Sequence, residues 1–120
     1  MTTERRGASR VAQRLPISIA QADGPVQVEA HNLSASGVYC TLHHVVPLMT
    51  KLQLQFDVPN GTKTGRIQCE GVVVRSELVN GRSNQYNTAI AFMNLTERSR
   101  DAITAFVRQH THSHFPHPAV

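Results

Sequence analysis

The stretch KLQLQFDVPNGTKTGRIQCEGVVVRSELVNG, residues 51–81, decides the fold of this chain. In its first ten residues the apolar side chains fall on every second position, which is typical of a β-strand with one buried face. Two Asn-Gly pairs, at 60–61 and 80–81, follow runs of this kind, and Asn-Gly is the strongest short hairpin signal. The stretch therefore predicts two long antiparallel strands joined by a tight turn, with a third strand beyond residue 81.

The second of these strands changes its apolar parity at Gly71. Ile67 and Cys69 occupy odd positions, whereas Val72 and Val74 occupy even ones. An extra residue in a strand shifts the alternation by one position, and glycine is common at such bulges. We therefore predict a bulge at Gly71 that restores one continuous inward face.

The rest of the chain has the same alternating pattern, followed by one helical segment. Strands are expected over 14–22, 24–34, 37–42 and 85–95, and a helix over 96–110 with Thr96 as its N-cap and a short apolar stripe of Ile103, Phe106 and Val107. The predicted fold class is mainly β: a small six-stranded antiparallel β-barrel with one C-terminal α-helix. We divide the chain into an arginine-rich leader at 1–12, the barrel and helix at 13–110, and a histidine-rich tail without order at 111–120.

The charge of the chain favours anionic partners. The 120 residues carry a formal net charge of +4, and all but two of the 12 basic residues are arginines. Arginine presents a planar fork of donors that matches phosphates and base edges, although a bias toward arginine codons explains the ratio equally well. There is no run of about 20 apolar residues that would span a bilayer and no apolar signal segment, so we expect a cytoplasmic location without a membrane segment.

Two short polar motifs attract attention because of their chemistry. Arg6 and Arg10 form an R-x-x-x-R pattern in the leader, and Asn32, Ser34 and Gly37 form N-x-S-x-x-G in the turn between the second and third strands. The arginines suit phosphate, while the turn offers amide, hydroxyl and accessible backbone groups. Each motif taken alone is equally an ordinary charged leader or an ordinary turn. Their separation matches one strand out and back, which brings the turn toward the leader.

The two motifs, RGASR and NLSASG, on a short barrel that ends in a helix, resemble the PilZ domain, a bacterial receptor for cyclic di-GMP. The resemblance covers about residues 5–109. It implies that Arg6 and Arg10 grip the phosphates and guanine edges of the dinucleotide. It further implies that Asn32 and Ser34 read a guanine while Gly37 keeps the turn open.

The resemblance also carries expectations for neighbouring positions. Arg5 precedes the first motif, where an extra arginine in the family goes with two stacked ligand molecules, although a solvated charge explains it equally. The chain departs from the family in having small residues at 7–9 and Ala89 where glycine is frequent. We predict a stand-alone receptor, not an enzyme, with cyclic di-GMP as its ligand and no other cofactor. Ligand binding is expected to order a mobile leader and so relay the signal to a protein effector.

Other functions remain open at this point. A PilZ-like fold acting through protein contacts alone, without a nucleotide, is the main alternative. A general nucleic-acid barrel needs stacking aromatics, and the chain has no Trp and only two Tyr, so no DNA or RNA is expected. The histidines of the tail are candidate metal ligands without a structural zinc spacing, and no metal site is predicted; they are His110, His112, His114 and His117. Cys40 and Cys69 are predicted to be small core residues.

Overall fold

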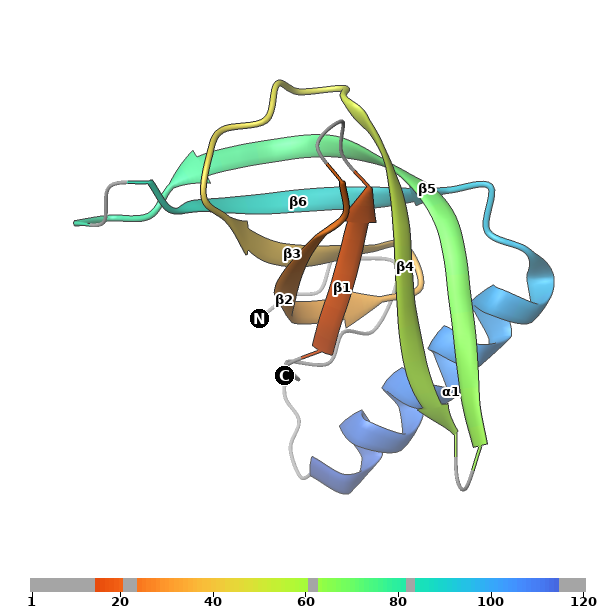
Figure 1. Ribbon diagram of the computed structural model, residues 1–120. Coiled ribbons are helices and arrows are strands. Elements are labelled where there is room, and N and C mark those ends of the chain that lie inside the picture. Colours follow the sequence, from red (N-terminus) through yellow and green to blue (C-terminus); the bar gives the residue numbers. More distant parts are fainter. Residues whose placement is uncertain (1–14, 21–23, 61–62, 82–83, 115–120) are drawn as a thin grey trace.

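The structure is a computed structural model, and it describes residues 15–20, 24–60, 63–81 and 84–114, without the side chains of 60, 63 and 110–114. These residues form a closed antiparallel barrel with strand order β1-β2-β3-β6-β5-β4 and one helix, α1. The bounds are β1 Leu15–Ala20, β2 Val26–Ser34, β3 Gly37–Leu42, β4 Lys51–Asn60, β5 Lys63–Leu78, β6 Tyr86–Met93 and α1 Glu97–His114. The predicted fold class is confirmed, and Figure 1 shows the helix beside one end of the barrel.

The alternation in the sequence fills the barrel. Along β1 the odd residues are buried and along β4 the even residues are buried, so both strands turn their aliphatic side chains inward. The core comprises Leu15, Ile17, Ile19, Ala30, Leu33, Val38, Cys40, Leu42, Val46, Leu52, Leu54, Phe56, Val58, Ile67, Cys69, Val73, Ile90, Ile103, Phe106 and Val107. Both cysteines are therefore core residues, as predicted. Burial raises the pKa of the Cys40 thiol to about 12 and that of Cys69 to about 11.

The predicted bulge at Gly71 is wrong. β4 and β5 pair without a register shift from Lys51↔Val72 to Asn60↔Lys63, and Gly71 itself lies on the inner face with Ile67, Cys69 and Val73. A Cβ at position 71 would lie 2.5 Å from Cγ2 of Ile90 and 2.9 Å from Cδ1 of Leu54. Glycine stands here because neighbouring side chains fill the space, which the apolar parity of the sequence does not reveal.

Two bulges occur elsewhere, one in β2 and one in β5. The register between β2 and β3 shifts between Ala30 and Asn32, and that between β5 and β6 shifts between Val73 and Arg75. One extra residue is thereby inserted in each strand, His31 in β2 and Val74 in β5. A bulge places two successive residues opposite one partner residue, so the inward alternation resumes one position later.

The helix α1 begins at the predicted cap and continues past its predicted end. The Ser99 amide donates to Oγ1 of Thr96 over 3.0 Å, which confirms Thr96 as the N-cap. Ile103, Phe106 and Val107 are buried, and α1 contacts β4, β5 and β2. Residues 111–114, assigned above to a tail without order, belong to the helix. No glycine or proline lies between residues 97 and 114, so the sequence does not interrupt the helix there. Residues 115–120 lie outside the described residues.

The two predicted hairpins differ in their loops. Asn60 pairs with Lys63, so only residues 61 and 62 separate β4 from β5. The second connection is longer: Leu78 pairs with Tyr86, the Val79 amide donates to the Gln85 carbonyl, and Gly81 has a φ of 71°.

Within the part of the chain that the structure describes, no helix combines the length and the apolarity that crossing a membrane requires.

Candidate ligand-binding face

Of the predicted site residues, those of the turn are described and those of the leader are not. Arg5, Arg6 and Arg10 lie outside the described residues. Asn32 lies on the outer face of the barrel, directly opposite Tyr39, because the bulge at His31 turns Leu33 rather than Asn32 into the core. Its side chain is half-buried. Ala30, two residues earlier, faces Leu15, so the turn lies beside the point where β1 begins.

Ser34 is wholly buried and its hydroxyl is engaged inside the turn. Oγ accepts a hydrogen bond from the Ser36 amide at 3.1 Å and lies 3.5 Å from the Gly37 carbonyl oxygen, to which it donates. A further hydrogen bond of 2.9 Å joins the hydroxyls of Ser34 and Ser36. A serine that bonds its own following backbone in this way stabilises the turn. In this structure Ser34 thus holds the loop that presents Asn32.

Gly37 is buried against the neighbouring strand β6. A Cβ at this position would lie 2.5 Å from the Ile90 carbonyl oxygen and 3.2 Å from the Cα of Ala91. The Phe92 amide donates to the Ser36 carbonyl at 3.0 Å, which keeps the turn next to β6. The glycine is therefore needed for the close approach of two backbones, whereas the sequence suggested that it keeps the turn open to a ligand.

A single cross-strand row links the two bulges. The register pairs Asn32 with Tyr39, Tyr39 with Ala89, and Ala89 with Arg75. The row thus crosses β2, β3, β6 and β5 on the outer face, with the bulged residues His31 and Val74 at its two ends. Nη1 of Arg75 donates to the Tyr39 hydroxyl over 3.2 Å, although β6 separates their strands. The side chain of Ala89 is small enough for these two side chains to meet above it. We call this outer surface of β2, β3, β6 and the end of β5 the bulged face.

A second set of polar side chains runs beside this row. Nε2 of His31 lies 2.6 Å from Oγ1 of Thr41, and the Thr41 hydroxyl donates to Oδ1 of Asn87 over 3.3 Å. Because a hydroxyl has one proton to donate, Nε2 of His31 is the donor in its pair. His31 and Thr41 also line a hollow of about 320 Å³ together with Gln27, Val28, Glu29, His43 and Gln85. The bulged face therefore presents donors, acceptors and an aromatic ring on one surface.

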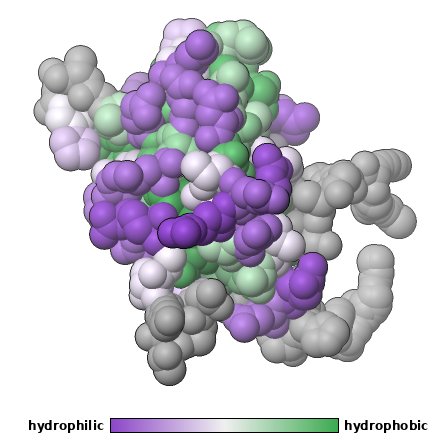
Figure 2. Space-filling view, turned by 90° about the vertical axis from the view of Figure 1, so that its right-hand side faces the viewer, coloured by the Kyte–Doolittle hydropathy of each residue, from purple (hydrophilic) through white to green (hydrophobic). Residues whose placement is uncertain are grey.

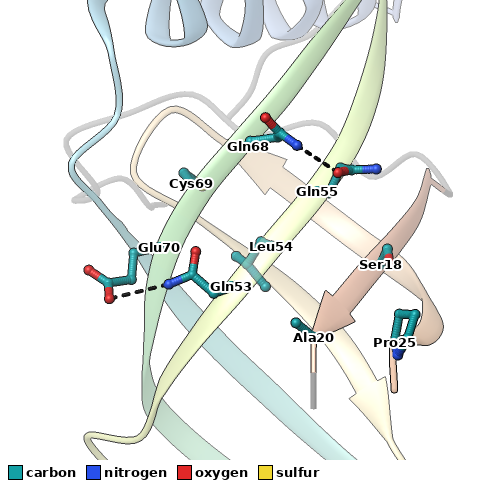
Figure 3. Close-up of a pocket in the computed structure, with 9 residues that line it drawn as sticks. All are labelled: Ser18, Ala20, Pro25, Gln53, Leu54, Gln55, Gln68, Cys69 and Glu70. Carbon is teal, nitrogen blue, oxygen red and sulfur yellow. Dashed lines mark hydrogen bonds between the residues drawn. The ribbon is translucent and has the colours of Figure 1, made fainter. Parts of the chain in front are cut away.

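The opposite outer surface, formed by β1, β4 and the first half of β5, is the regular face. A larger depression of about 540 Å³ lies on it, lined by Ser18, Ala20, Pro25, Gln53, Leu54, Gln55, Gln68, Cys69 and Glu70 (Figure 3). Its polar groups bond one another: Gln68 donates to Gln55 over 2.8 Å, and Gln53 donates to Glu70 over 3.4 Å. The sole charged residue of this lining is a carboxylate, so the depression is poorly suited to an anion.

The remaining surface is mixed. Figure 2 views the side that lies at the right of Figure 1 and shows mainly hydrophilic residues, with hydrophobic ones exposed between them. Among the described residues there is no group of three or more His, Cys, Asp or Glu side chains placed to hold a metal ion. The side chains of the four histidines of the predicted tail lie outside the described residues.

His31, Tyr39 and Arg75 were not predicted to be neighbours of the motif. The bulge in β2 has a signal in the sequence, because the apolar position moves from even at Ala30 to odd at Leu33. The bulge in β5 has a weaker signal, since Val72, Val73 and Val74 leave the position of the shift open. The pairing of Arg75 with Tyr39 depends on the order of strands around the barrel, which no local pattern contains.

Comparison with known proteins gives one family and a consistent fold. A family model described as the PilZ domain matches residues 4–109, which include both motifs. A search among curated proteins gave no match. Among solved structures, the chain is similar to the Bacillus subtilis inhibitor of motility (MotI/DgrA), with a TM-score of 0.78 and 20% identity over 89% of this chain. The match covers 51% of that protein, so this chain spans about half of its length.

Two isolated PilZ domains have the same fold. The PilZ domain of YcgR from Escherichia coli, solved with c-di-GMP, has a TM-score of 0.63 and 14% identity over 89% of this chain and 92% of that one. The PilZ domain of CeSA from a cellulose-synthesizing bacterium has a TM-score of 0.51 and 14% identity over 84% and 93% of the two chains. At these identities the likeness concerns the arrangement of the strands and the helix.

Proposed function

Because this chain belongs to the PilZ domain family, we propose that it is a receptor for cyclic di-GMP that binds the dinucleotide between Arg6, Arg10 and the turn containing Asn32. PilZ domains are receptor and adaptor domains rather than enzymes. The family match includes both motifs, and one solved relative of the same fold carries the dinucleotide. These findings support cyclic di-GMP as the ligand.

The observation that carries the proposal is the position of Asn32. The bulge holds its side chain on the outer face, two residues after Ala30, which pairs with the first residue of β1. Arg10 precedes that residue by five positions, and five residues span at most about 17 Å. The start of β1, to which the leader is attached, thus lies near the turn. A site shared between the leader and the turn requires this proximity.

Each residue then has a role that follows from its chemistry. Arg6 and Arg10 bind the phosphates and the O6 and N7 edge of guanine through charge-assisted hydrogen bonds. Asn32 bonds the other edge of a guanine with its side-chain amide. Ser34 and Gly37 act by shaping the turn, Ser34 through its hydroxyl and Gly37 through the close approach of β6. Arg5 stacks on a second ligand molecule when two are bound.

The signal passes to a protein effector by ordering of the leader. A ligand that bridges residues 5–10 to the barrel creates a surface that the free chain lacks, and a partner with higher affinity for that surface responds to the dinucleotide. We propose a cytoplasmic location for this receptor, as expected from its sequence.

Calorimetric titration with cyclic di-GMP tests the proposal. We expect binding by the wild type and a loss of affinity of at least about a hundredfold in Arg6→Ala/Arg10→Ala, because two charge-assisted contacts are removed. Arg66→Ala/Arg98→Ala is the matched control, since it removes the same charge from exposed positions elsewhere. GTP and linear pGpG control for ligand identity, and the stoichiometry tests the role of Arg5. Absence of heat from a folded wild-type sample would contradict the proposal.

A protein-interaction module without a nucleotide is the second candidate function. One observation favours it: Val45, Leu48 and Met49 are exposed in the connection between β3 and β4. The Met49 amide donates to the Val73 carbonyl, which places this connection beside the exposed Val74. Exposed apolar groups that gather in this way are typical of protein contacts. If the titration shows no binding, this surface is where a partner should be sought.

A further inference from the structure

The cross-strand row continues the bulged face beyond the residues of the two motifs. Asn32 stands at its β2 end, while Tyr39 and Arg75 occupy its centre and its β5 end. Three inter-strand spacings separate β2 from β5, or about 14 Å between the first and last Cα. A single base held at Asn32 covers only one end of this row, whereas a cyclic dinucleotide has a second guanine.

We propose that Tyr39 and Arg75 form the binding surface for a second guanine base, on the same face as Asn32. This inference rests on the proposed function and extends it to residues outside the two motifs. The guanine stacks on the Tyr39 ring, and the Arg75 guanidinium donates to its O6 and N7 atoms.

The geometry of the pair supports this role. A guanidinium has five N–H donors, and among the described contacts Tyr39 takes one of them, at Nη1. The bond to the tyrosine hydroxyl restrains a long side chain that would otherwise lose rotamer entropy on binding. Tyr39 and Arg75 therefore present a ring and a fork of donors that are already arranged side by side.

The surrounding charge favours a base over a phosphate. Glu77 lies two positions after Arg75, on the same outer face of β5, and it is exposed. A carboxylate this close repels a phosphate. Guanine is uncharged, and it offers the acceptors of its edge to Arg75 and the face of its ring to Tyr39.

This surface requires a small residue on β6, between the strands β3 and β5 that carry Tyr39 and Arg75. Tyr39 and Arg75 meet above Ala89, the residue that pairs with both of them. A longer side chain at position 89 would stand between the phenol and the guanidinium and block a base from lying on the row. Ala89→Leu is therefore expected to act like the loss of Arg75.

Tyrosine emission reports directly on this contact, because the chain has no Trp and only two Tyr. In a Tyr86→Phe background the emission comes from Tyr39 alone. We expect cyclic di-GMP to quench it in proportion to the binding measured by calorimetry. The complementary variant Tyr39→Phe, which retains Tyr86, corrects for absorption by the ligand and should show no saturable quenching.

Affinities provide the second readout. Arg75→Ala should weaken cyclic di-GMP binding by about ten- to a hundredfold, the range of one bidentate contact to guanine, and Tyr39→Phe by about threefold through loss of the restraining hydroxyl. Arg66→Ala, an exposed arginine on the same strand but on the regular face, should leave the affinity unchanged. Equal melting temperatures for these variants would separate a binding role from a structural one.

The outcomes distinguish this inference from the function on which it rests. Binding by the wild type with unchanged Tyr39 emission, or with full affinity in Arg75→Ala and Ala89→Leu, would overturn the second guanine site and leave the receptor proposal intact. No binding by the wild type would overturn both. Quenching together with the stated losses would support both.

Discussion

On the regular face three bonded pairs of polar side chains lie directly opposite one another, whereas on the bulged face one bond spans a whole intervening strand, beside the directly opposite pair Thr41 and Asn87. Asp57 and Arg66, Gln55 and Gln68, and Gln53 and Glu70 are all register partners in β4 and β5. Arg75 and Tyr39, by contrast, meet across β6. An unbroken register pairs polar groups locally and leaves them little to offer a ligand. A bulge moves successive side chains to one surface and concentrates them there.

The largest expected effect is on stability, and it comes from replacing a glycine of the bulged face. Gly37→Val places a side chain against the backbone of β6, where a Cβ alone lies 2.5 Å from the Ile90 oxygen. Backbone cannot yield as a side chain does, so we expect a loss of about 3 kcal/mol or more in the free energy of unfolding. Urea denaturation measures this loss.

Gly65→Ala on the β4–β5 hairpin is the control. Its Cβ would meet the Cβ of Ala102 at an ordinary 3.6 Å, so its stability should change by less than about 1 kcal/mol. Equal denaturation midpoints for the Gly37 variant and the wild type would show that β6 does not constrain the turn.

The next effect compares the buried thiols on the two sides of the barrel. In the folded state the pKa of Cys40, on β3, is about 12 and that of Cys69, on β5, is about 11, both above the ordinary thiol value. Above about pH 9 the unfolded chain releases these protons while the folded chain retains them. Stability is thus complete below pH 9 and falls as the pH rises, by up to about 1.4 kcal/mol per unit for each thiol.

Urea midpoints at pH 8.5, 9.5 and 10.5 measure this slope. Cys40→Ala should flatten it relative to the wild type, whatever the variant costs at pH 8.5, because only the slope reports the proton. Cys69→Ala should flatten it as well, because the folded chain also keeps the Cys69 proton over this pH range. Parallel curves for the wild type and Cys40→Ala would argue against a buried thiol at this position.

A smaller effect tests the packing that replaces the predicted bulge. Gly71→Ala forces Ile90 and Leu54 to move, and side chains can shift, so we expect a cost of about 1–2 kcal/mol. In an Ile90→Ala background the same substitution should cost less, because the methyl group that it meets is absent. A double-mutant cycle in urea measures this coupling. Additive costs would mean that Gly71 does not contact Ile90.

The smallest effect concerns the exposed ion pair of the regular face. Nε of Arg66 lies 2.6 Å from Oδ1 of Asp57, with both side chains about half exposed. Solvent screens such pairs, so Asp57→Asn should change the unfolding free energy by about 0.5 kcal/mol or less and leave ligand binding unaltered. A clear loss of affinity for cyclic di-GMP would instead place the ligand on the regular face.

Much of this fold is readable from local pattern. Alternating apolar residues identified the six strands, Thr96 identified the start of α1, and the motif around Asn32 identified the turn that presents the candidate site. A bulge was wrongly predicted at Gly71 because the alternation of apolar residues does not count glycine as an inward residue. Its inward position depends on the volumes of Leu54 and Ile90. The end of α1 was misread because residues 111–120 lack apolar periodicity and contain two prolines, although neither of these occurs before position 116.

The sequence by itself determined the class of the fold, the position of the turn and the arginine motif of the leader, because periodicity and turn chemistry are local properties of a chain. Only the tertiary structure decided that Asn32 and Arg75 share one row of the barrel. That row depends on the order of strands and on two register shifts. These are settled when two strand pairs distant in sequence, β2–β3 and β5–β6, close around one core, since their inward side chains must fill it together.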